Sequence, residues 1–156
     1  MKILKAIKYI KNKSTLKDGF QLEEPNLFVQ WELVPEELVQ LFKSMPLKKV
    51  TNEYFTIECI SLGGLPHKLG FHFYSQSPNR LYMLEFFRES YPDYIESFRE
   101  FQEHFENTFG KPTKQYPINS EGFPSFEWRI GKSIQIRHYI MDRFGLEERL
   151  FIQRAI

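Results

Sequence analysis

The residues of this sequence most able to do acid–base, nucleophilic or metal chemistry are four histidines and one cysteine: His67, His72, His104, His138 and Cys59. The histidines are scattered, and no two of them have the i, i+4 spacing of a helical zinc site. A single cysteine excludes an internal disulfide and a multi-cysteine metal site. We therefore expect no metal site.

The surroundings of His138 and Cys59 favour structural roles. A catalytic histidine needs a partner within hydrogen-bond reach. His138 lies on an isoleucine-rich strand face, and Asp142 on the same side already falls in the following turn. Cys59 alternates with Phe55 and Ile57 on another strand, where a buried cysteine acts as a small hydrophobe. We predict that both residues belong to the core and that neither is catalytic.

Two short motifs resemble parts of known sites but lack their context. "STLK" (residues 14–17) has the S-x-x-K spacing of a serine–lysine nucleophile, without the other boxes that accompany it. "GGLPHKLG" (residues 63–70) is rich in glycine, but it joins two strands, whereas a phosphate-binding loop opens a helix. With no dinucleotide or nucleotide fingerprint elsewhere, we predict a protein that is not an enzyme and takes no cofactor.

Length and composition predict one domain over residues 1–156 with an aromatic-rich core. The chain is 42% hydrophobic and 17% aromatic, and 16 of its residues are phenylalanine. No apolar run approaches the roughly 18 residues that span a bilayer, and lysines interrupt the N-terminal segment too often for a secretion signal. The lone cysteine suits a reducing compartment. We expect a cytoplasmic protein without a membrane partner.

Charge is distributed unevenly along the chain. The first 17 residues contain six lysines and no acid: Lys2, Lys5, Lys8, Lys11, Lys13 and Lys17. Because the whole chain carries +1 and this lysine comb carries +6, residues 18–156 carry −5. Ile3, Leu4, Ile7 and Ile10 have helical spacing, so we expect a short amphipathic helix whose lysines form the wet side of a docked element. The alternative is a surface for anionic lipid or nucleic acid.

The order of the remaining elements predicts the fold class. Alternation of apolar and polar residues indicates strands at residues 27–33, 53–62, 69–73, 80–87, 126–130, 134–140 and 149–154. Helical patterns fall near residues 2–12, 35–45 and 90–109. Short loops join the strands within each group of three, which favours antiparallel pairing. We predict an α+β fold with a largely antiparallel sheet of six to seven strands and helices packed on one face.

The third of these helices has two contrasting faces. Its aromatic stripe comprises Tyr91, Tyr94, Phe98, Phe101, Phe105 and Phe109, with Ile95 beside them. Opposite lies an acidic stripe whose central members are Asp93, Glu96, Glu100 and Glu103. Like charges at i, i+4 cost a few tenths of a kcal/mol per pair. The stripe is either an ordinary solvated face or, as we predict, a docking surface for a protein partner with a basic surface.

Two further surfaces enter the prediction. The solvent side of the sheet carries Tyr82, Arg137 and Tyr139, residue types common at protein interfaces, and we include them among the partner-binding residues. An alternative function, a small-ligand-binding protein or enzyme, would need a pocket between the sheet and the aromatic helix. Its expected lining is Phe71, Phe98, Phe101 and Trp128. Nucleic-acid binding through the lysine comb is the other alternative.

The layout of the chain resembles the small α+β immunity proteins of bacterial toxin systems, of the contact-dependent growth inhibition and type VI secretion kinds. The segments that carry the resemblance are "NLFVQWELVPEELVQLFKS", "KLGFHFYSQSPNRLYMLEFF", "FENTFGKP" and "FEWRIGKSIQIRHYI". The resemblance implies a cytosolic, non-enzymatic inhibitor that binds one cognate toxin domain. It carries over no functional residues, since such families diverge at the interface.

Overall fold

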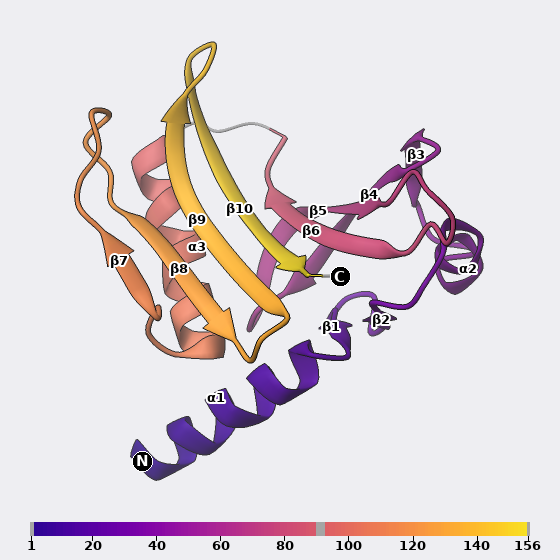
Figure 1. The fold of residues 1–156 in the computed structure, drawn as a ribbon, viewed down its shortest axis with the longest axis horizontal. Coiled ribbons are helices and arrows are strands. Elements are labelled where there is room, and N and C mark those ends of the chain that lie inside the picture. The colour runs from indigo at the N-terminus through magenta and orange to yellow at the C-terminus, as the bar shows by residue number, and fades with distance from the viewer. Residues whose placement is uncertain (1, 90–92, 156) are drawn as a thin grey trace.

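Alternating apolar residues build a large antiparallel sheet, and the computed structural model describes it over residues 2–89 and 93–155 (Figure 1). The helices are α1 (Lys2–Leu16), α2 (Pro35–Leu41) and α3 (Tyr94–Phe109). The strands are β1 (Gly19–Gln21), β2 (Phe28–Gln30), β3 (Lys48–Thr51), β4 (Tyr54–Ser61), β5 (Leu65–Phe73), β6 (Leu81–Phe87), β7 (Lys114–Tyr116), β8 (Ser125–Ile130), β9 (Ile134–Asp142) and β10 (Leu146–Arg154).

Eight of these strands form one sheet in the order β3-β4-β5-β6-β10-β9-β8-β7, with every pair antiparallel. The first four and the last four are joined by short connections in sequence. The two groups meet where Met83, Leu84 and Glu85 of β6 pair with Gln153, Ile152 and Phe151 of β10. The predicted α+β class and antiparallel sheet are confirmed. The seam between the groups was not predicted.

The predicted number of strands was too low. The sheet has eight strands, and β1 and β2 form a separate pair. All residues of β3 and of β7 are exposed, and β1 and β2 have three residues each. Strands β3 and β7 are held by backbone pairing at the two edges of the sheet, so they carry no alternation of apolar and polar residues for a sequence reading to detect. Strand β1 is too short to show one, whereas β2 lies within the strand predicted at residues 27–33.

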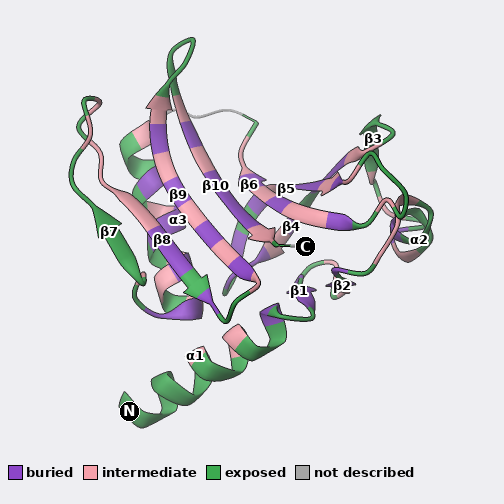
Figure 2. Cartoon of the chain, in the orientation of Figure 1, coloured by how far each residue is buried: buried purple, intermediate pink, exposed green. Residues whose placement is uncertain are grey.

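One face of the sheet holds the core. Phe71 of β5 packs against Phe42, which follows α2, with ring centroids 5.6 Å apart. Phe105 of α3 contacts both Phe86 of β6 and Trp128 of β8, at 5.1 and 5.9 Å. Thus α2 and α3 lie on the same face, as predicted, and α3 spans the seam between the two groups of strands. In Figure 2 buried and less buried residues alternate along β9, and less regularly along β8 and β10.

The aromatic stripe of α3 is buried where it was predicted, but the helix starts later. Phe98, Phe101, Phe105 and Phe109 are buried, whereas Ile95 is 67% exposed. The N-cap is Asp93, whose carboxylate accepts from the backbone amides of residues 95 and 96. Because this cap fixes the first turn, the helix begins at Tyr94 rather than near residue 90. Tyr91 lies outside the described residues.

Helix α1 is longer than expected and is attached only near its C-terminal end. It continues through "STL" to Leu16, a buried residue whose carbonyl accepts from Trp31 Nε1 at 2.8 Å. Asn12 donates to the carbonyl of Thr108, at the end of α3, also at 2.8 Å. Figure 2 shows almost the whole of α1 as exposed. Its isoleucines are therefore not docked on the sheet, which corrects the expectation of a docked element.

Candidate functional site

His138 belongs to a fully buried hydrogen-bond network between α3 and the sheet. Its Nε2 lies 2.6 Å from Glu148 Oε2, and its Nδ1 lies 2.8 Å from Gln102 Oε1. The Ser97 hydroxyl donates to the other carboxylate oxygen of Glu148 at 2.6 Å. The ring of Phe98 stacks on the imidazole at 4.0 Å. His138 therefore has the partner that the sequence reading did not find.

The arrangement of this network suits structure rather than catalysis. The serine bonds to the carboxylate and not to the imidazole, so Ser97, His138 and Glu148 do not form a nucleophile–base–orienter chain. Burial lowers the pKa of His138, while the hydrogen bond and charge of Glu148 oppose that shift. The predicted core position of His138 agrees with the complete burial of its side chain.

A second buried network does have the serine–histidine geometry. The Nδ1 of His67 lies 3.0 Å from the Lys68 carbonyl and therefore carries its proton, so Nε2 accepts from the Ser61 hydroxyl at 2.5 Å. The Cys59 sulfur lies 3.7 Å from the same nitrogen. These are the contacts of a hydroxyl nucleophile and its base. No sequence motif predicts these contacts, because Ser61 and His67 come together only when β4 and β5 pair in the hairpin.

This serine–histidine pair is closed to substrates. Ser61, His67 and Cys59 are all buried on the core face, and Phe86 and Phe101 flank the imidazole. Burial lowers the pKa of His67 to about 4 and raises the pKa of the Cys59 thiol to about 12. Within residues 2–89 and 93–155 no group of three potential ligands is arranged to hold a metal ion. The pair therefore supports core packing.

The acidic stripe on α3 is exposed, but its carboxylates are already engaged. Asp93 caps the helix, and Glu100 pairs with Arg88 at 2.5 Å. Arg99 lies between Glu96 and Glu103 and pairs with both. The pairs of Arg99 are solvent-exposed and contribute little to stability. The row of carboxylates is thus partly neutralised by the protein's own arginines, which weakens the attraction it offers to a basic partner.

The other predicted partner-binding residues lie together on the sheet face that α2 and α3 leave uncovered. Arg137 and Tyr139 alternate with the buried residues of β9, and the guanidinium of Arg137 lies 4.9 Å from the Tyr139 ring. Tyr139 in turn contacts Phe151 of β10, edge to face at 6.4 Å. Tyr82 of β6 stacks on Tyr74 at 4.3 Å. We call this surface the uncovered sheet face.

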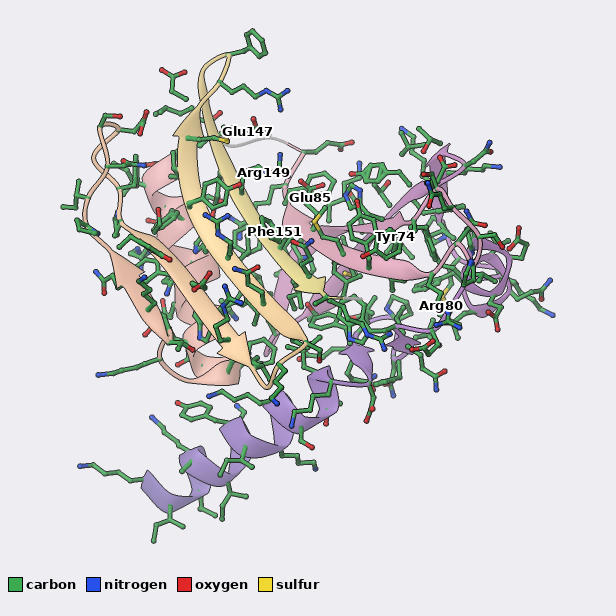
Figure 3. All side chains as sticks on the ribbon, in the orientation of Figure 1. Tyr74, Arg80, Glu85, Glu147, Arg149 and Phe151 are labelled. Atoms are coloured by element: carbon green, nitrogen blue, oxygen red, sulfur yellow. The ribbon has the colours of Figure 1, made fainter. Side chains whose placement is uncertain are left out.

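A charged cluster occupies the middle of the uncovered sheet face, where β6 and β10 meet (Figure 3). Glu85 lies 3.1 Å from His72 Nε2 and 3.4 Å from an Arg149 nitrogen, and it also bonds to Tyr54. Burial alone would raise the pKa of Glu85. The bond from His72 and the charge of Arg149 outweigh burial and lower that pKa. Burial and the nearby Glu85 charge raise the pKa of Tyr54 to about 12. Glu85 is therefore ionised at neutral pH.

Arg149 is held in place without being saturated. Its terminal nitrogens lie 3.4 Å from Glu85 and 3.6 Å from Glu147, longer than good hydrogen bonds, and its side chain is 25% exposed. Its Nε is buried and has no hydrogen-bond partner within the part of the chain that the structure describes. In Figure 3 Glu147, Arg149 and Phe151 follow one another along β10, with Glu85 beside them. The guanidinium is thus held between two carboxylates, with its side chain partly exposed.

A cleft of about 450 Å³ opens at one end of this face, between the β5–β6 turn and the end of β10. Tyr74, Tyr82, Arg80 and Arg154 are among its lining residues. Glu32 bridges the two arginines, at 3.2 Å from Arg80 and 2.7 Å from Arg154, and the bond from Arg154 lowers the pKa of Glu32. The cleft combines flat aromatic walls with a positive rim.

The residues expected to line an interior pocket are packed instead. Phe71, Phe98, Phe101 and Trp128 are all buried. The cleft described above is lined by other residues and lies at the surface.

Comparison with known proteins adds no relative. The chain matches no protein-family model, no curated protein and no solved structure. The resemblance to toxin-immunity proteins therefore stays a prediction. Across the described residues, no helix combines the length and the apolar character needed to cross a membrane.

The structure brings together part of the predicted site and adds to it. Arg137 and Tyr139 share a strand, Tyr82 lies further along the same face, and the four acidic residues lie on α3. The sequence reading missed Glu85, Arg149 and Phe151. The sequence pattern that could have identified these three residues is the one that put Arg137 on the solvent side of the sheet, because each of them lies between two buried neighbours on β6 or β10.

Proposed function

We propose that this protein is a non-enzymatic inhibitor of the immunity type, which binds a cognate toxin domain through the uncovered sheet face. The observation that carries the proposal is the group of arginine and tyrosine side chains on that face, with Arg149 at its centre and Arg137, Tyr139 and Tyr82 around it, while the buried ring of Phe151 supports Tyr139. Arginine and tyrosine are enriched among the residues that dominate protein-binding energy.

The geometry of the face suits a partner protein. Its side chains are fixed by stacking and ion pairs before any partner arrives, which reduces the entropy lost on binding. The Arg149 side chain is 25% exposed and can contact a partner, and the cleft beside Tyr82 can receive a protruding side chain. The partner surface that fits here is partly apolar and carries groups that can contact Arg137 and the tyrosine rings, so it need not be basic, as the acidic stripe on α3 suggested.

A binding role also fits the position of the chemically able groups. The Ser61–His67 pair and the His138–Glu148 pair lie inside the core, whereas the residues on the uncovered face are those that bind rather than react. We place the protein in the cytosol on the strength of its lone, buried cysteine.

The test begins with capture of the native partner by the tagged full chain, followed by affinity measurements with two sets of variants. Arg137→Ala with Tyr139→Ala removes two of the side chains that surround Arg149 on the uncovered sheet face. Glu96→Lys, Glu100→Lys and Glu103→Lys reverse the acidic stripe. We expect the first set to weaken binding by at least about tenfold. The second set serves as a matched surface control and leaves the affinity unchanged.

Thermal melting of each variant separates lost binding from lost folding. Inhibition is then scored as loss of the partner's toxicity when the two proteins are produced together. If the first set binds normally and the charge reversal abolishes binding, the interface is the acidic stripe on α3. If the captured partner keeps its toxicity in the presence of the protein, the inhibitor proposal is wrong.

A second candidate function rests on the cleft alone. Its size lies within the range of small-ligand sites, and stacked tyrosines beside Arg80 and Arg154 suit a flat, anionic ligand. Such a ligand would raise the melting temperature, and Arg154→Ala would remove that rise. Absence of any ligand-dependent shift across a panel of anionic aromatic compounds argues against this role.

A further inference from the structure

Helix α1 presents an apolar stripe to solvent. Ile3, Leu4, Ile7 and Ile10 are 75%, 69%, 56% and 68% exposed. At 100° per residue, the three isoleucines fall within an arc of about 60°, and Leu4 adjoins it. Leaving four large apolar side chains in water on one helix is costly, since each gains roughly 1.5–3 kcal/mol when fully buried. The stripe therefore calls for a surface that covers it.

The attachment of α1 holds this stripe away from the rest of the protein. Tyr9 packs near Gly110, Asn12 bonds to the end of α3, and Leu16 enters the core. On the helical wheel these three residues lie on the side opposite the isoleucines. In Figure 1, α1 forms the lower edge of the molecule, and no other element lies beyond it. A flat surface can thus approach α1 along its length.

Lysines flank the stripe on both sides. Lys2 and Lys13 border it on one side, Lys8 and Lys11 on the other, and residues 2–17 contain no acid. Long lysine side chains extend their charge past an apolar surface toward the polar layer above it. An apolar stripe between two rows of lysines is the pattern of helices that lie in the plane of an anionic membrane surface.

Other occupants fit less well. The cores of protein interfaces are depleted in lysine and enriched in aromatic residues and arginine, and the stripe has neither. A second copy of α1 would bring two lysine-rich helices side by side, where like charges repel. Nucleic acid would engage the lysines but leave the isoleucines in water.

We propose that α1 is a membrane-surface helix, whose isoleucine stripe inserts between the headgroups of anionic phospholipids while its lysines bind their phosphates. This would be peripheral binding, independent of the partner-binding role of the uncovered sheet face. It revises the sequence-based expectation of no membrane partner, which rested on the absence of a spanning segment.

The test is co-sedimentation of the full chain with vesicles of phosphatidylcholine alone or mixed with phosphatidylglycerol, over a series of salt concentrations. We expect binding only to the anionic vesicles, weakening as salt rises. Ile7→Gln with Ile10→Gln should abolish it. Lys8→Gln and Lys11→Gln should each weaken it roughly fivefold, because a basic residue near the surface contributes about 1 kcal/mol.

Ile118→Gln is the matched control, since Ile118 is 69% exposed but lies far along the chain from α1, and it should leave binding unchanged. All of these side chains are in water, so equal melting temperatures will show that the variants are folded. No binding to anionic vesicles at low salt overturns the proposal. So does binding that the isoleucine changes leave intact, or a dimer that those changes dissociate.

Discussion

His67 makes the stability of this protein depend on pH in a window that can be calculated. Its imidazole is buried against Phe86 and Phe101, and burial lowers its pKa from 6.5 to about 4. In the unfolded chain His67 takes up a proton as the pH falls through 6.5, whereas in the folded protein it stays neutral until about pH 4. Unfolding is therefore favoured as the pH falls across this window, and full stability returns above it.

The size of the effect follows from this difference. A pKa difference of one unit corresponds to about 1.4 kcal/mol. At about pH 5 the unfolded chain is almost fully protonated at His67 and the folded protein is not, so the free energy of unfolding falls by about 2 kcal/mol relative to about pH 7.5. Most carboxylate titration lies below this window.

The assay is urea unfolding at these two pH values, with variants that isolate the ring. Ser61→Ala keeps the titrating imidazole, and Ser61→Ala with His67→Phe replaces it by a ring of similar shape without leaving the buried hydroxyl unpaired. The first variant should lose about 2 kcal/mol more than the second. His138 contributes equally to both. Equal losses in the two variants, or an NMR titration of His67 near 6.5, would refute the reasoning.

Three other predictions concern stability. Glu148→Ala leaves His138 buried without its partner and should cost about 3–5 kcal/mol, while Glu148→Gln should cost less because it keeps a hydrogen-bonding group there. Asp93→Ala removes the N-cap of α3 and should cost about 0.5–2 kcal/mol, with Asp93→Ser restoring most of it. Gly110→Ala should cost about 1–3 kcal/mol, because φ is +82° and the new Cβ would lie 3.2 Å from the Tyr9 ring. Chemical denaturation measures all three, and a change within error of zero would contradict each.

Periodicity predicted the parts of the fold in which every second or every fourth residue meets the core. The alternation in β8 and β9 and the phenylalanines of α3 are examples, and the structure confirms both. The three strands that were not predicted, β1, β3 and β7, could not be found in this way. Residues 48–51 and 114–116 are exposed on both sides of the strand. Only their backbone hydrogen bonds make them strands, and these leave no pattern of apolar residues in the sequence.

The sequence analysis missed Glu148 as the partner of His138 because it placed the start of the last strand too late. The last strand was expected to begin at Arg149, whereas β10 begins at Leu146, directly after the Gly145 turn. Pairing of Leu150 with His138 then places Glu148 one step further along the same face. Had the pairing of β9 with β10 been extended to the turn at Gly145, it would have placed the Glu148 carboxylate beside the His138 imidazole. The Glu85–Arg149 contact was less accessible, because it crosses the seam between two strands far apart in sequence.

That seam has a consequence for how the chain reaches its native state. Each group of four strands is built from neighbours in sequence, which pair quickly. Residues 85 and 151, in contrast, are 66 positions apart in the sequence (151 − 85) and must meet across that whole loop. Closing so long a loop costs entropy, which the three residue pairs of the seam and the packing of Phe105 across it must offset. We therefore expect each group of four strands to form early in folding and their joining across α3 to come late.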